Sequence, residues 1–482
     1  MQLKDFAAYK KGLWQTSAVM MVVFVLCLLG VSAYMALSVG VMCVLCLLCL
    51  KDFGRNCFFF FCLASFFVYL MSGEIAEVLF DRHYYMRFHS EVIFHSHRCI
   101  LISLSFILVG YWFTAPVSRV NRALKPVFLF SDRSVVARVT QVSSWVYWVA
   151  YSVLMINTID TVIFVMRYDY VAYYTQYDPF LPALIGEVGD FAPIALCVFL
   201  ATRPSKKRAL PVMASYMGYA VLSLLIGARG TLIYTAVFMV AYCFYRNYTD
   251  RKQGVVWIPK LVVIGLCAAV PFLLAFLFLY EYIRTGRPVE FESIGTAIVD
   301  FFVNIGSGSK IIKLGYTYRT QIPSMRFYSL GGVLNYFKYG TLFNLFSLDS
   351  IPATHSVRYA TESHAFTAIL SYLHMPESFL AGHGTGSCYI AELFADFGYF
   401  GVALGSAVYG WFFKKLSTLR VQNWLLAGAK LYVMFEFLKA PRAGYDGFIS
   451  NLLNVNYIAV VVFIGVLAVY LDRRNRRIPA KG

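Results

Sequence analysis

The sequence predicts an all-α, polytopic membrane protein with about twelve transmembrane helices and one large loop outside the membrane. Two observations lead to this fold class. Hydrophobic residues make up 60% of the 482 residues and charged residues only 14%, and the mean hydropathy is +0.65. Soluble proteins lie far from these values. Backbone polar groups inside hydrocarbon must be hydrogen-bonded internally, so apolar runs of about 20 residues predict helices.

Twelve apolar runs follow one another along the chain. Nine precede a long polar, aromatic-rich segment and three follow it. We expect membrane helices at approximately 14–32, 34–50, 56–73, 99–115, 140–165, 187–202, 210–227, 231–246, 257–280, 388–413, 424–440 and 448–471.

Charge predicts how these helices are oriented. If the N-terminus is cytoplasmic, the alternate connections on that side hold most of the 42 Lys and Arg residues and few of the 25 acidic ones. This bias is the positive-inside rule. The formal net charge of +17 is therefore a topology signal and does not indicate a nucleic-acid partner. Both termini are expected to be cytoplasmic.

The same topology divides the chain into three parts. Residues 1–280 form helices one to nine, residues 281–387 form a large periplasmic loop with the substrate-binding and catalytic residues, and residues 388–482 form helices ten to twelve with a basic cytoplasmic tail. Chemistry in water is expected in the loop.

Arginines on the outer side are the first candidate site residues. Arg229 lies in a Gly-Ala-Arg-Gly hinge between two spans, where glycines let backbone approach a ligand closely. Arg284 and Arg287 lie just past the ninth span. Guanidinium groups suit phosphate oxygens, so we expect all three to bind phosphate. The alternative is that they anchor helix ends at the membrane surface.

A cluster of ionisable residues near the end of the loop is the candidate catalytic group. His355, Arg358, Glu362 and His364 lie within ten positions, before an apolar turn. A carboxylate or imidazole here could accept a proton from a substrate, with Arg358 binding substrate. A solvated surface cluster is the alternative.

Arg442 lies beyond the eleventh span, where Pro441 and Gly444 break the helix. We expect Arg442 to face a central cavity and bind substrate. A structural pair with Asp446 is the alternative.

A glycine-rich segment, GHGTGSCYIAELF, precedes the tenth span. Gly384 and Gly386 could wrap phosphate with backbone N–H groups, and Ser387 could cap the helix. Glu392 and Asp396 share one helix face. Carboxylates at membrane depth are functional candidates, so Glu392 is a second candidate base. The alternative is a structural role, in which the helix dipole favours these negative charges near the N-terminus of the helix.

No cofactor or metal is expected. His95 and His97 have spacing that suits a metal, but the interleaved Phe, Val and Ile residues favour an interfacial amphipathic segment.

These motifs resemble the Wzy-type O-antigen and capsule polysaccharide polymerases. The resemblance rests on Arg229-Gly230 between spans, the large outer loop, the pattern G-x-G-x-G-S-x-Y-I-A-E-x-x-x-D-F-G-Y-x-G and the closing PR-x-G. It covers most of residues 210–460. Cys388 stands where family members often have a second Ser, which argues against a nucleophile there.

The resemblance implies a metal-independent glycosyltransferase with a GT-C-like architecture. It would transfer a growing glycan from undecaprenyl diphosphate to a lipid-linked repeat unit on the outer face of the cytoplasmic membrane. Membrane lipids, undecaprenyl-diphosphate-linked oligosaccharide and a chain-length regulator are the expected partners. An O-antigen ligase and a flippase of lipid-linked oligosaccharide remain open as alternatives. A flippase would predict repeated halves, and the sequence shows no repeat.

Overall fold

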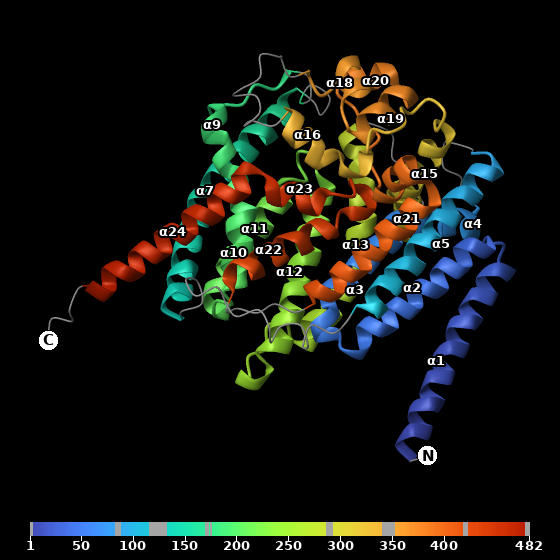
Figure 1. Cartoon of the computed structure of the whole chain (residues 1–482), viewed down its shortest axis with the longest axis horizontal. Coiled ribbons are helices and arrows are strands. Elements are labelled where there is room, and N and C mark those ends of the chain that lie inside the picture. Colours follow the sequence, from blue (N-terminus) through green and yellow to red (C-terminus); the bar gives the residue numbers. More distant parts are fainter. Residues whose placement is uncertain are drawn as a thin grey trace.

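The structure is a computed structural model, and it describes residues 3–81, 88–114, 133–168, 173, 176–285, 293–339, 352–417 and 423–477. Within these ranges the chain is helical and contains no strand. Long tilted helices run between two ends of the molecule, and α1 stands at one edge (Figure 1).

The N-terminal helices pack against one another and against the C-terminal part of the chain. Between α3 and α4 the helix continues through η1, a single π turn, so that one rod extends over Phe53–Phe80. A π turn re-aims the side chains around it and is frequent at functional sites. The elements are α1 (Leu3–Leu28), α2 (Ala33–Lys51), α3 (Phe53–Phe66), η1 (Phe67–Met71), α4 (Ser72–Phe80) and α5 (Ser90–Phe113).

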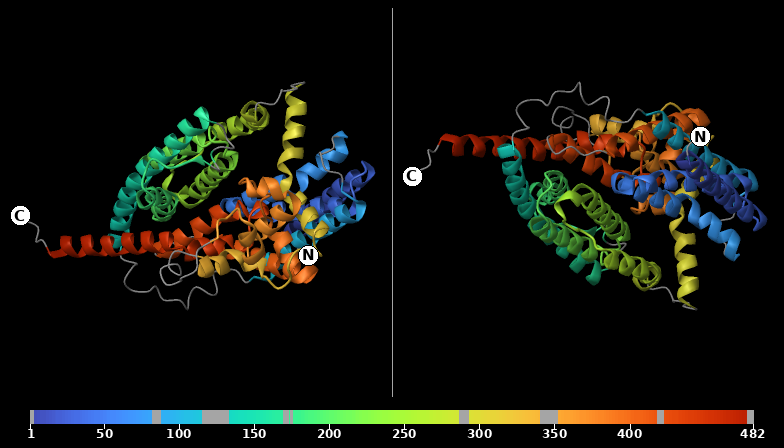
Figure 2. Two further views of the ribbon diagram at one scale, coloured as in Figure 1. Left: turned by 90° about the horizontal axis from the view of Figure 1, so that it is seen from above. Right: turned by 90° about the horizontal axis from the view of Figure 1, so that it is seen from below.

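The middle of the chain forms a second group of helices, which lies beside the first (Figure 2, teal to yellow-green). Its longest member, α7, packs against α10, α11 and α24. The elements are α7 (Arg133–Arg167), α9 (Ala183–Gly186), η2 (Glu187–Asp190), α10 (Phe191–Ala201), α11 (Lys206–Leu222), α12 (Arg229–Thr249), η3 (Arg251–Gln253) and α13 (Lys260–Thr285).

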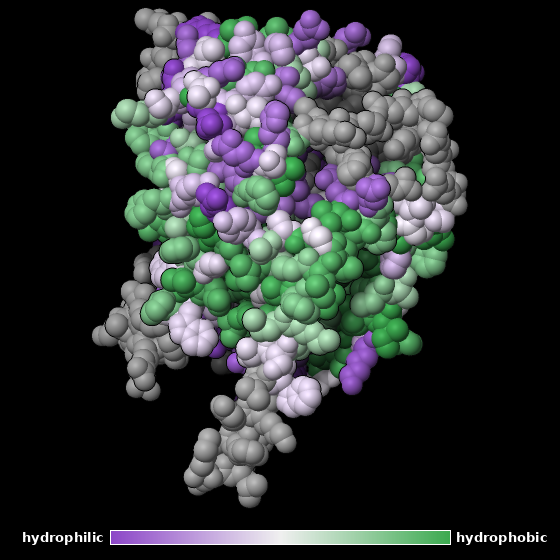
Figure 3. Space-filling view, turned by 90° about the vertical axis from the view of Figure 1, so that its right-hand side faces the viewer, coloured by the Kyte–Doolittle hydropathy of each residue, from purple (hydrophilic) through white to green (hydrophobic). Residues whose placement is uncertain are grey.

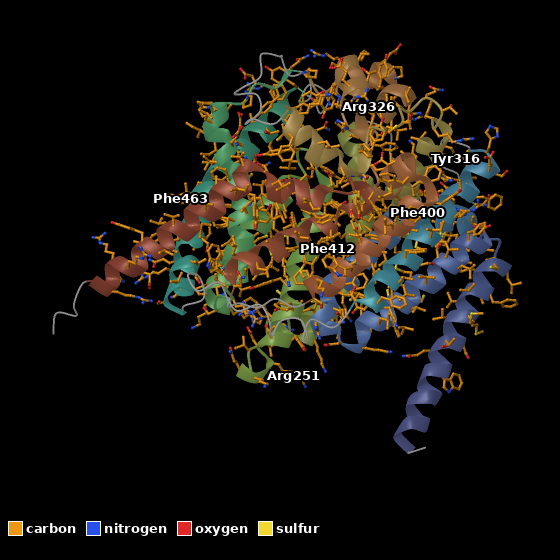
Figure 4. All side chains as sticks on the ribbon, viewed as in Figure 1. Arg251, Tyr316, Arg326, Phe400, Phe412 and Phe463 are labelled. Carbon is orange, nitrogen blue, oxygen red and sulfur yellow. The ribbon has the colours of Figure 1, made fainter. Side chains whose placement is uncertain are left out.

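The described parts of residues 281–387 form short helices. Most of them gather at one end of the molecule, which we call the loop end; Tyr316 and Arg326 lie there, and Arg251 lies at the opposite end (Figures 1 and 4). The elements are α14 (Ile294–Ile305), α15 (Ser307–Thr317), η4 (Tyr328–Leu330), α16 (Gly331–Tyr339), α18 (Val357–Glu362), α19 (Phe366–His374) and α20 (Pro376–Leu380).

The C-terminal helices complete the core. Helix α21 packs closely on α5 because a glycine lies on each side of the contact. A Cβ atom at Gly110 would collide with the Ala407 carbonyl, and one at Gly410 would collide with the Ile107 carbonyl. Gly398, with φ +61°, breaks the helical geometry within α21. The elements are α21 (Tyr389–Leu416), α22 (Trp424–Phe437), η5 (Ala440–Arg442), α23 (Gly447–Leu453) and α24 (Val455–Arg477).

Among the described residues, eight helices are long and apolar enough to cross a membrane. They match eight of the twelve predicted spans. The other four predictions correspond to the shorter apolar helix Trp14–Leu28 and to α11, α12 and α22, so the count of twelve stays a prediction. Hydrophobic residues form a belt across the middle of the surface, with hydrophilic residues above it at the loop end (Figure 3). The fold is that of a multi-pass membrane protein.

Candidate active site

A cavity of about 550 Å³ opens among helices from all parts of the chain. Its wall combines four basic side chains with His374, two tyrosines and the glycine-rich segment, and none of the described residues that line it is acidic. We call it the cationic cavity. Its basic residues are Arg229, Lys310, Lys439 and Arg442.

Arg229 enters the cavity from the first position of α12, as the hinge predicted. Gly227, with φ +91°, makes the reversal from α11 possible. The side chain is half-buried, and its Nη1 donates to the Leu277 carbonyl at 3.2 Å. An α-helix also carries partial positive charge at its N-terminus. The positive charge of the guanidinium and the partial positive charge at the start of α12 therefore act on the same part of the cavity.

Lys310 comes from α15, which approaches two other elements unusually closely. A Cβ at Gly308 would lie 2.8 Å from the carbonyl oxygens of Pro441 and Tyr69. Glycine at this position lets α15 touch both η1 and η5. As a result, Lys310 and Tyr69 reach the same cavity as the residues of η5. Burial lowers the pKa of the half-buried Lys310 ammonium.

The turn after α22 supplies the other two basic residues. Lys439 forms an ion pair with Glu436 at 2.8 Å, and Arg442, which is exposed, ends η5. Arg442 and Asp446 form no ion pair within the described residues, because the buried Asp446 accepts from the backbone N–H of Val333 at 2.7 Å. Arg442 lines the cationic cavity, and its expected role in binding substrate stays a prediction.

His374, at the end of α19, is the imidazole in the wall. The Tyr318 hydroxyl lies 3.5 Å from its Nδ1. Burial lowers the pKa of His374, and the charge of Lys310 lowers it further. The ring is therefore neutral at pH 7 and can accept a proton.

The glycine-rich segment reaches the cavity through Gly384 and Thr385. The Thr385 backbone N–H donates to Ser371 Oγ at 2.9 Å, and Gly386 adopts φ +82°. Ser387 does not cap the following helix: Cys388 is the N-cap residue, without a side-chain cap bond. Ser387 Oγ instead donates to Glu392 at 2.6 Å.

Glu392 is buried, with 4% of its surface exposed. Its second carboxylate oxygen accepts from the Tyr445 backbone N–H at 2.8 Å. The carboxylate thereby ties the glycine-rich segment to the turn that carries Arg442. Asp396, one turn later, accepts from the backbone N–H groups of Tyr328 and Ser329 and orients η4.

The predicted cluster at 355–364 lies apart from the cavity, since none of its residues lines the wall. Arg358 and Glu362 form an exposed ion pair at 3.1 Å. His355 Nδ1 lies 3.0 Å from the Phe379 carbonyl, and His364 Nδ1 contacts the Arg326 carbonyl. These contacts connect short helices at the loop end, and the catalytic role of the cluster stays a prediction.

Two predicted phosphate-binding arginines cannot be placed. Arg284 belongs to α13, but its side chain is not among those described, and Arg287 lies outside the described residues. The two histidines with metal-like spacing diverge: His95 contacts the Tyr399 hydroxyl and His97 contacts Glu74.

Sequence reasoning missed Lys310, Lys439 and His374. A signal was present for the two lysines, because the predicted topology places both on the outer side, where the positive-inside rule disfavours basic residues. For His374 the sequence offered only an ordinary position at the end of an amphipathic turn.

Within the described residues the fold is that of a helical multi-pass membrane protein, and the basic wall of its cavity suits an anionic ligand. Comparison with protein families makes this specific. The chain matches the family described as O-antigen polysaccharide polymerase Wzy over residues 14–475, nearly its whole length. It belongs to that family. No curated protein and no solved structure gives a significant match.

Proposed function

We propose that the protein polymerises a lipid-linked polysaccharide: it transfers a growing glycan from undecaprenyl diphosphate to the repeat unit on a second lipid carrier. The observation that carries this proposal is the cationic cavity, whose described wall holds four basic side chains and no carboxylate. Such a wall suits a diphosphate, which is strongly anionic and accepts bidentate hydrogen bonds.

The reaction breaks the bond between the glycan's anomeric carbon and a diphosphate oxygen, and it forms a bond from that carbon to a hydroxyl of the acceptor sugar. Negative charge grows on the departing diphosphate. Arg229, Lys310 and Arg442 would stabilise this charge in a partly dry cavity. These side chains would do without a metal what Mg²⁺ does in many reactions of phosphate esters.

The acceptor hydroxyl must lose its proton during the transfer. His374 is the best placed group, since it is neutral and lines the cavity. Glu362, His364, His355 and Glu392 remain candidates from the sequence. For one of these four residues to accept the proton, the substrate would have to extend beyond the cavity or the loop end would have to rearrange.

A polymerisation assay tests this proposal. Cells or proteoliposomes carrying Arg442→Ala are expected to make single repeat units in place of a glycan ladder. Arg319→Ala is the matched control, because Arg319 is an exposed arginine at the loop end that does not line the cavity. Loss of the ladder in the control as well, at normal protein abundance, would refute a specific role for the cavity.

The proposal also requires the loop end to face the periplasm, with both termini in the cytoplasm. Cysteine at the exposed position Glu377 should react with a membrane-impermeant thiol reagent in spheroplasts, and cysteine at the exposed Lys252 should react only after lysis. The native Cys99 and Cys388 are buried, and the exposed native Cys27 and Cys267 are replaced by serine in both variants. The opposite labelling pattern would overturn the orientation.

A further inference from the structure

A second charged hollow lies at the other end of the molecule from the cationic cavity. It has a volume of about 360 Å³ and is formed where α2 ends, α3 begins, and α5 and α21 end. Helix α21 starts next to the glycine-rich segment at the cavity and ends at Lys414 and Lys415, and α5 packs along it. The two sites are therefore on opposite sides of the membrane-spanning bundle.

The walls of this hollow are predominantly basic. Lys51, Arg55 and Lys414 line it, with Asp52 as the one acidic residue among the described lining residues. We call it the basic pocket. Lys414 lies over the Tyr111 ring at 4.2 Å, and the Tyr111 hydroxyl donates to the buried Asn56 at 3.3 Å. Packed aromatic and amide groups thus hold the lysine at the pocket.

The position of Arg55 is informative because it is electrostatically unfavourable. Lys51 and Lys414 lie in the last turns of α2 and α21, where a helix dipole favours cations. Arg55 lies in the first turn of α3, where the dipole disfavours them. Helix stabilisation explains the two lysines but not the arginine. The positive-inside rule favours cations at this end of the molecule, and a bound anion would offset the unfavourable position of Arg55 at the start of α3.

The rim of the pocket identifies where that anion comes from. Trp112 lines the pocket and is 68% exposed, and its neighbour Phe113 is 82% exposed. Leu50, next to Lys51, is 54% exposed. Exposed aromatic and aliphatic side chains beside a basic hollow are typical of a membrane–water interface. A headgroup in the pocket would leave its acyl chains against apolar surface.

We propose that the basic pocket binds the phosphate headgroup of an anionic phospholipid in the leaflet opposite the cationic cavity. Lys51, Arg55 and Lys414 provide the charge, and Asn56 and Ser417 are polar lining groups that can bond the headgroup. This site is separate from polymerisation and does not depend on the substrate of the cationic cavity.

Native mass spectrometry of the purified full-length protein tests this inference. Phosphatidylglycerol should bind more tightly than phosphatidylethanolamine, and Arg55→Gln with Lys414→Gln should weaken it roughly thirtyfold, from the contribution of each basic side chain at an anionic surface. The matched control is Arg251→Gln with Lys252→Gln, which removes two exposed cations from the same end outside the pocket. This control variant should bind phosphatidylglycerol with the same affinity as the wild type.

Two further measurements keep the test decisive. The exposed Lys51→Gln gives a milder variant if the double variant fails to fold, and it should show a smaller loss in the same direction. Glycerol 3-phosphate, which has the phosphate but no acyl chains, should not compete at equal concentration. Equal weakening in the control variant, an unchanged affinity in both pocket variants, or effective competition by glycerol 3-phosphate would each overturn the assignment to a lipid.

Discussion

Two groups of charged side chains lie near one another toward the loop end, and they are built differently. In the first, buried Glu74 contacts both Lys313 and His97, with Ser309 donating to it at 2.6 Å. We call this the Glu74 network. In the second, the cationic cavity, four basic side chains share a wall without an acidic lining residue among those described.

The difference separates structure from binding. A buried carboxylate that contacts an ammonium, an imidazole and a hydroxyl satisfies its charge within the protein, so the Glu74 network connects η1–α4, α5 and α15. A wall lined by basic side chains suits an anionic ligand. Lys310 lies on the wall of the cavity and also beside the hollow next to Glu74. The network thus supports one wall of the site.

The largest effect on stability is expected at Glu74. Glu74→Ala leaves Lys313 and His97 buried without their carboxylate, which typically costs about 3–5 kcal/mol. The thermal unfolding midpoint of the purified protein should fall sharply, and Glu74→Gln with Lys313→Met should recover part of the loss. If Glu74→Ala unfolds at the wild-type temperature, the network does not hold these helices.

The cavity should show the opposite behaviour, with activity lost and stability kept. Arg229→Ala is expected to slow chain extension by roughly 10²–10³-fold, as for other donors that stabilise a developing anion. Lys439→Ala should cost less, because Glu436 already offsets that charge. The rates of the purified variants, measured beside their unfolding midpoints, check the order. A larger loss of rate in Lys439→Ala than in Arg229→Ala would show that Glu436 does not offset the charge of Lys439.

The pH profile should report His374. Burial lowers the pKa of His374, so the acidic limb of the rate, where the proton acceptor is lost, should lie at a lower pH than for an ordinary histidine. His374→Gln should be slow throughout and lack this acidic limb. The groups that face the His374 ring are Lys310, whose charge lowers the pKa of the ring, and the Tyr318 hydroxyl. An acidic limb that persists in His374→Gln would assign the titration to another group.

The smallest effects are expected at the exposed pair of Arg358 and Glu362. Exposed ion pairs contribute about 0–1 kcal/mol, so Glu362→Gln should barely change the unfolding midpoint. The same variant tests the catalytic prediction made from the sequence. We expect it to slow chain extension less than His374→Gln does, and the reverse order would place the proton acceptor in the 355–364 cluster.

The sequence predicted the class of fold and part of the site for physical reasons that can be identified. Apolar runs report directly on membrane helices, and a hinge arginine and a helix-breaking Pro441 mark cavity positions because both constrain the local backbone. The contribution of Lys310 was hidden, since it depends on contact between Gly308 and two elements more than 100 residues away along the chain. The 355–364 cluster lies outside the wall of the cationic cavity because proximity along the sequence does not bring side chains to one cavity, and its catalytic role stays a prediction.

Binding of undecaprenyl diphosphate to the purified protein tests the central claim most directly. Wild type and Arg319→Ala should bind it equally. Arg229→Ala with Arg442→Ala should bind it at least about 100-fold more weakly, because two charge-assisted hydrogen bonds to phosphate are lost. Equal affinity of the double variant and the wild type, with both proteins folded, would contradict the assignment of the cationic cavity to the lipid diphosphate.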